Sequence, residues 1–153
     1  MEDPYDANEI THYVLHCHIG SHGRPRYDWV VFPKTRLEDK DRELPGIKRF
    51  EIGQLRLLFE LTHNFQIFQL AYIQMFHLPW GGIEPYTQLQ IAMRTNNYKI
   101  IPVSTIIRHV HLIPYFMRVN TALKAHHNNS DVYSFPGYLV NKYCDRYSWE
   151  NFR

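Results

Sequence analysis

The residues with the clearest chemical potential are histidines near the N-terminus. On a strand, His12, His16 and His18 would share one face while Cys17 points to the other. Imidazole groups are ligands that suit zinc and other transition metals. However, three neighbours on one strand lie too nearly in a line to close a tetrahedral site. The sequence therefore favours an exposed row of histidines, and no metal or other cofactor is expected.

A second pair of alternating histidines provides the one alternative metal site. His109 and His111 also lie two residues apart in an apolar segment. Together with His16 and His18 they would supply four imidazole groups, provided that the two strands are adjacent. The sequence alone does not decide this arrangement, so it stays an alternative.

No nucleophile or pair of carboxylates has the setting that catalysis needs. Cys17 alternates with the histidines and would face away from them, and Cys144 lies among aromatic residues. The acidic residues of positions 38–43 belong to one charged loop. We therefore expect no catalytic residue and no small-molecule substrate. Two cysteines without a CxxC unit also favour a reducing, intracellular compartment.

Basic and aromatic residues occur together near expected strand ends. If the fold gathers them, they could follow a phosphate backbone and stack bases. The formal net charge is only +2, with 17 basic and 15 acidic residues, so ordinary surface charge is the simpler interpretation and any footprint for nucleic acid must be local. The candidate contact residues for nucleic acid or another partner are Arg24, Arg26, Tyr27, Trp29, Arg94, Lys99 and Arg108.

Length and composition predict one folded domain. The chain has 153 residues, of which 44% are hydrophobic and 15% aromatic, enough to build a core. Residues 1–11 read as a polar tail and residues 12–153 as a single domain. No uninterrupted apolar run approaches the length of a bilayer span, so we expect a soluble protein without a membrane partner.

Short apolar segments at spacings of about ten residues predict strands. They cover residues 13–19, 27–32, 50–61, 65–78, 89–93, 98–101 and 109–113, with a charged loop at 33–45. The apolar alternation slips at Gly53, which predicts a β-bulge there. Residues 72–76 are apolar on both faces, as in a covered central strand. Thr95–Asn97 predicts a turn, Ser104 a helix cap, and Tyr138–Phe152 a closing helix.

These elements define the expected fold class. It is mainly β: a small, strongly bent antiparallel sheet or barrel, similar to BAH and SH3-like domains, with a C-terminal helix. Such a closed shell is expected to bury its aromatic side chains.

Two ordered motifs resemble the C-terminal region of fungal transposases of the KDZ and Plavaka type, relatives of the CACTA group. Val103–Pro114 (VSTIIRHVHLIP) is similar to the family's V-x-x-S-I-L-R-x-x-H-L-I-P run. Tyr138–Tyr147 (YLVNKYCDRY) is similar to its Y-x-V-N-K-Y-x-D-x-H ending. The resemblance covers roughly residues 23–152. Thr105 and Tyr147 depart from the pattern.

The resemblance implies a role without catalysis. In these transposases an acidic triad lies in an RNase H-like domain upstream, and this chain looks like the region that follows. It would be a nuclear interaction module that contacts DNA or a chromatin or transposase protein. Two alternatives stay open: a structural remnant without activity, and a histidine-rich metal-binding protein.

Overall fold

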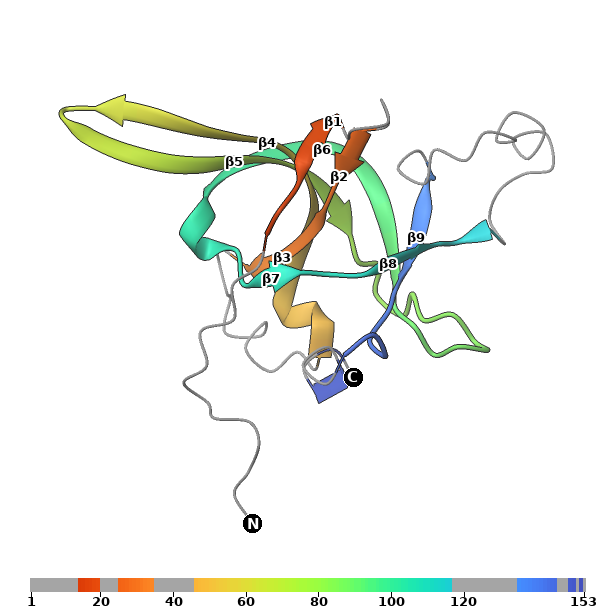
Figure 1. The fold of residues 1–153 in the computed structure, drawn as a ribbon. Helices are drawn as coiled ribbons and strands as arrows, with labels where there is room; N and C mark the ends of the chain where they lie inside the picture. The colour runs from red at the N-terminus through yellow and green to blue at the C-terminus, as the bar shows by residue number, and fades with distance from the viewer. Residues whose placement is uncertain are drawn as a thin grey trace, which may run out of the picture.

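The computed structural model describes residues 14–19, 25–34, 46–116, 135–145, 149–150 and 152, and nearly all of the regular structure in these ranges is β (Figure 1). The mainly β class is therefore confirmed. No helix in the described ranges is long and apolar enough to cross a membrane. The strands are β1 (Cys17–Ile19), β2 (Pro25–Tyr27), β3 (Trp29–Pro33), β4 (Phe50–His63), β5 (Gln66–His77), β6 (Ile91–Pro102), β7 (Arg108–His109), β8 (Leu112–Pro114) and β9 (Gly137–Val140), and the two short 3-10 helices are η1 (Gly46–Arg49) and η2 (Val103–Thr105).

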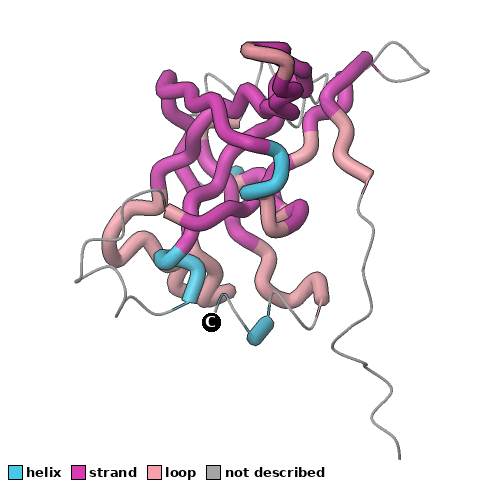
Figure 2. The backbone as a smooth tube through the Cα atoms, turned by 90° about the vertical axis from the view of Figure 1, so that its left-hand side faces the viewer, coloured by secondary structure: helices cyan, strands magenta, loops and turns pink. Residues whose placement is uncertain are grey.

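The main sheet curls until its two edges meet. Its strand order is β7-β3-β4-β5-β6-β9-β8, with every pairing antiparallel. The edge strands β7 and β8 are nevertheless separated by only Val110 and His111. Val110 N donates to Trp29 O of β3 at 2.8 Å, and His111 O accepts from Asn141 N, just after β9, at 2.9 Å, so this short link joins the two ends of the strand order. The expected strongly bent, barrel-like sheet is confirmed (Figures 1 and 2).

Each face of the curled sheet carries its own apolar core. The inner face gathers side chains from strands all around the curl, among them Val31, Ile52, Phe76 and Tyr138. Alternate residues of β3 to β6 form a second cluster on the outer face, against which Leu15, Cys17, Val103 and Ile106 pack. Consequently residues 73–76 of β5 are buried on both faces, as their sequence predicts.

The predicted bulge at Gly53 is wrong in position. The register between β4 and β5 shifts between Leu55 and Leu57, which makes Arg56 the extra residue. Gly53 is needed for another reason: a Cβ atom there would overlap Ile73 Cγ2 and lie 3.0 Å from the Gln74 carbonyl oxygen. The missing side chain therefore permits a close approach of β4 and β5.

Two predicted breaks near β6 are also wrong. Thr95–Asn97 is not a turn, because β6 runs through it and absorbs a register shift against β5 between Gln74 and Phe76. Thr95 Oγ1 donates to Met75 O at 2.7 Å and holds the irregular stretch to its neighbour. Ser104 is not a helix cap, since it lies inside η2, whose preceding residue Pro102 makes no side-chain cap.

The C-terminal helix predicted for Tyr138–Phe152 is wrong where it should begin. Gly137–Val140 forms β9, inserted between β6 and β8, and all four of its residues are buried. Residues 142–145 form turns and bends; in the rest of the described C-terminal part, only 149–150 and 152 are helical. Pairing with two strands outweighs the helical spacing of aromatic residues. The polar tail at 1–11 lies outside the described residues, as does the charged loop beyond Lys34.

We predict that Gly53→Ala lowers the free energy of unfolding by about 1–3 kcal/mol, the usual cost of overpacking a core. Urea titration measures this loss. Gly137→Ala is the matched control, because the nearest atom to its new methyl group would be the flexible Met93 Sδ at 3.2 Å. Equal losses in the two variants would contradict the close approach at Gly53.

Candidate interaction surface

A long hairpin arm projects from the curled sheet (Figure 1). We define the arm as residues 57–72, which are the outer part of β4, a two-residue turn and the first part of β5. The register places alternate side chains of both strands on one face, next to two residues of β6. This apolar face consists of Leu57, Phe59, Leu61, Phe68, Leu70, Tyr72, Tyr98 and Ile100.

The apolar face continues the inner face of the sheet beyond the core. Ile52 and Phe76 belong to the inner core and lie on the same side of β4 and β5 as the apolar face. Outside the core the covering ends: Leu57 is 51% exposed, Phe68 41% and Ile100 59%. A contiguous apolar patch of this kind on a sheet is typical of a surface that meets a partner.

The tip of the arm exposes an aromatic side chain at a conformational cost. Asn64 and Phe65 form the turn with φ values of 49° and 61°. A tight hairpin turn with positive φ at both positions favours Asn and Gly, whereas a bulky residue is strained there. Phe65 is also fully exposed. Phenylalanine at this position favours neither the stability nor the solubility of the protein, which points to a role for Phe65 in contacting a partner.

A buried polar network holds the base of the arm. Arg56, the bulge residue, donates to Gln74 Oε1, and Gln74 Nε2 donates to Thr95 O at 2.7 Å. The Arg56 guanidinium also lies 5.0 Å from the centre of the Tyr27 ring. Gln54 is fully buried beside Gln74, and its amide meets no hydrogen-bond partner among the described residues. This polar layer separates the inner core from the apolar face.

The basic residues predicted to contact nucleic acid are mostly engaged in ion pairs. Arg26 lies 3.5 Å from Asp28 Oδ1, and Lys99 Nζ lies 2.6 and 2.8 Å from the two Glu51 oxygens. Arg94 is half-buried on β6, and its Nε atom has no hydrogen-bond partner in the described part of the chain. These contacts offset the positive charge that phosphate recognition requires.

The other predicted contact residues do not form a common surface either. Tyr27 packs against Arg56, and Trp29 packs on the buried Tyr138 with ring centres 5.4 Å apart. Arg108 is buried on β7. Arg24 lies outside the described residues.

The histidines predicted as an alternative metal site have separate neighbours. His16 Nδ1 lies 3.0 Å from Asp28 Oδ2, and His111 Nδ1 lies 3.1 Å from Asn141 Nδ2. His18 is on β1, which pairs with β2, whereas His109 is on β7, which pairs with β3, so backbone pairing does not make these strands adjacent. Within the described ranges no three His, Cys, Asp or Glu side chains come together as a metal site.

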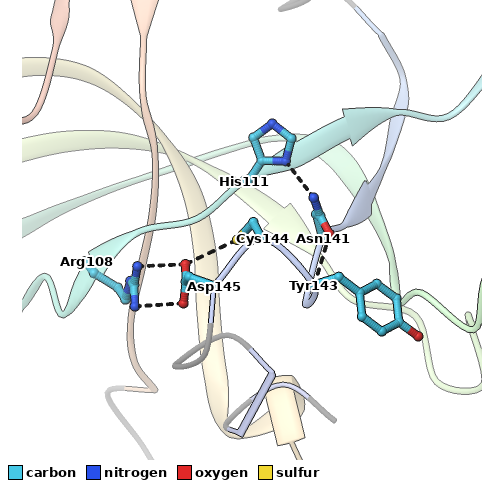
Figure 3. A network of polar contacts seen from close by, with 6 residues as sticks. All are labelled: Arg108, His111, Asn141, Tyr143, Cys144 and Asp145. Atoms are coloured by element: carbon cyan, nitrogen blue, oxygen red, sulfur yellow. Dashed lines mark hydrogen bonds and ion pairs between the residues drawn. The ribbon is translucent and has the colours of Figure 1, made fainter. Parts of the chain in front are cut away.

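The structure brings the segments Val103–Pro114 and Tyr138–Tyr147 together, as far as it describes them (Figure 3). β8 of the first motif pairs with β9 of the second. Arg108 donates two hydrogen bonds to Asp145, at 3.2 and 2.8 Å, and Asp145 Oδ2 also lies 3.2 Å from Cys144 Sγ. The Asn141 side-chain oxygen accepts from Tyr143 N at 3.0 Å. The hydrogen bonds between Arg108 and Asp145 hold the segment after β9 against β7.

A hydrogen-bonded loop between β5 and β6 presents two further aromatic residues. The buried Glu84 carboxylate accepts hydrogen bonds from Tyr86 N at 3.1 Å, Thr87 N at 2.6 Å and Thr87 Oγ1 at 2.6 Å. These bonds, that of the Thr87 hydroxyl foremost, lower the pKa of Glu84 below its ordinary value. Trp80 and Tyr86 are exposed on this loop, and Lys48 Nζ lies 4.3 Å from the centre of the Trp80 ring.

Sequence reasoning missed the arm because it expected the aromatic residues to be buried. That expectation is wrong for Phe65, Phe68, Trp80, Tyr86 and Tyr98, which are all exposed. A usable signal was present: two apolar segments of more than ten residues, joined by a very short polar turn, are too long for the strands of a small barrel.

Comparison with known proteins identifies no relative: no family model, curated protein or solved structure matches this chain.

We predict that Asp145→Ala costs about 2 kcal/mol of unfolding free energy, because it removes the carboxylate that accepts two hydrogen bonds from the buried Arg108 guanidinium. The double variant Arg108→Leu/Asp145→Ala should lose less than the sum of the two single variants. Urea titrations of the three variants and the wild type give the coupling energy. Additive losses would show that the pair does not act as a unit.

We predict a pH-dependent role for Glu84 in holding the loop. Its folded-state pKa is lower than 4.5, so its stabilising contribution is fully present above pH 4.5 and is lost as the pH falls through the folded-state value. Glu84→Gln should therefore destabilise the protein at pH 7, and the difference from the wild type should shrink below pH 4.5. Denaturation curves of both proteins, recorded at pH values above and below 4.5, measure this difference in unfolding free energy. A difference that does not change with pH would contradict the role of Glu84.

Proposed function

We propose that this chain is a non-enzymatic, nuclear interaction module of transposase descent, and that it contacts a protein partner through the apolar face of its arm. The observation that carries the proposal is a set of large apolar side chains held in the open by a regular sheet. Strands position such residues rigidly, so little conformational entropy is lost when a partner covers them.

The charge distribution favours protein over nucleic acid as the partner. Glu60 is the one charged residue among positions 57–72, and it lies on the opposite side of the arm from the apolar face. A phosphate backbone would find no cation on the apolar face, and at Lys99 it would compete with Glu51 for the ammonium group. Burying Leu57, Leu61 and Phe68 against an apolar surface of a protein partner is favourable, because it removes apolar surface of both molecules from water.

The proposed descent rests on the two sequence motifs and is supported by their contact. Residues shared with the family pattern, Arg108 and Asp145, form an ion pair, and His111 contacts Asn141. A physical contact between separate motifs gives a structural reason for their joint occurrence. Nuclear action follows from the same kinship, since a transposase works on chromosomal DNA.

The proposal is tested with an arm variant, Leu61→Thr/Phe68→Thr. The two residues face each other across the arm, and threonine suits a strand, so the sheet should be retained. In proximity labelling in cells, we expect the variant to label the partners of the wild type about tenfold less, because the two residues lie at the centre of the proposed interface. The control variant Trp80→Thr/Tyr86→Thr removes two even more exposed aromatic side chains from the loop and should leave labelling unchanged.

Fluorescence anisotropy with duplex and single-stranded DNA completes the test. We expect no salt-dependent binding in the micromolar range. Binding that is lost in Arg26→Ala/Lys99→Ala but kept in the arm variant would overturn the proposal in favour of nucleic acid. Identical labelling by wild type and arm variant would favour an inactive structural remnant.

A further inference from the structure

We infer that the partner of the apolar face is a second copy of this chain, packed face to face about a two-fold axis. The inference rests on the proposed function and names the occupant of the same surface. In such an arrangement each patch covers its own duplicate, so one surface satisfies both subunits.

The charges of the arm permit two copies to approach without repulsion. None of the eight residues of the apolar face is charged, and Glu60 projects from the other side of the arm, where Gln69 Nε2 donates to it at 3.2 Å. Like charges brought together across an interface cost several kcal/mol, and an uncharged face avoids this cost when it meets its own duplicate.

The arrangement of polar residues around the apolar face resembles that of an interface. His63 and Gln66, both exposed, border the face at the tip, whereas Gln54 and Gln74 lie buried on the same side of the strands and end it at the base. An apolar centre with polar ends is the usual anatomy of a protein contact. The Tyr72 and Tyr98 rings, stacked with centres 5.2 Å apart, add a flat aromatic platform near the base.

The size of the face suits a reversible dimer. The face is three strands wide at its base, where β6 lies beside β5, and two strands wide at the tip. Strands about 4.8 Å apart that rise roughly 3.3 Å per residue give it an extent of at most about 14 by 23 Å, so two opposed faces would cover on the order of 600 to 1,000 Å² in total, the range of a weak and reversible complex. Twisted antiparallel sheets pack face to face at a spacing of about 10 Å. A dissociation constant in the micromolar range is therefore expected.

Sedimentation equilibrium of the wild-type chain from about 1 to 200 μM tests this inference. We expect a monomer at the lowest concentration and a dimer at the highest. Leu57→Asp and Leu57→Lys should each stay monomeric throughout the series, because either charge would be buried in an apolar contact without a partner.

Tyr86→Asp is the control, since it places the same charge on an exposed position outside the arm and should dimerise like the wild type. Circular dichroism and thermal melting establish that each variant is folded. A wild type that is monomeric at 200 μM, or a dimer that Tyr86→Asp disrupts as strongly as Leu57→Asp, would overturn the inference. If the wild type is monomeric while the arm variant still loses its labelled partners, the proposed function stands and only the second copy is excluded.

Discussion

Closure of the sheet by residues 108–114 is the constraint on which the structure depends. This short segment supplies β7 at one end of the strand order and β8 at the other, so the sheet cannot remain open. Its link places Val110 against β3 and His111 beside the end of β9. The inner core forms because the edges meet, since its members come from strands all around the curl.

The arm is the part of the sheet that this closure does not include. β4 has 14 residues and β5 has 12, whereas β3 and β9 have five and four, so the hairpin extends well beyond the part of the sheet that closes. Beyond the bulge at Arg56 the side chains keep their apolar alternation but lose the opposite wall. One continuous pattern in the sequence therefore yields a buried core at one end and an open surface at the other.

Local patterns predicted the strands well, because alternation is a property of neighbouring residues. They predicted the mainly β class, the covered part of β5 and the curvature of the sheet. They failed where a distant pairing decides the outcome: β9 is a strand because β6 and β8 flank it, and Gly53 matters because Ile73 approaches it. The candidate surface was missed for the same reason, since nothing local reveals where the opposite wall of a barrel ends.

The position of β9 also sets an order of events for the nascent polypeptide. β6 and β8 are complete by Pro114, yet the strand that joins them begins at Gly137. During synthesis the inner core therefore stays open until this late segment has left the ribosome, and contacts between residues far apart in sequence form slowly. A ribosome paused between these positions would hold an unclosed sheet whose apolar interior is accessible to chaperones.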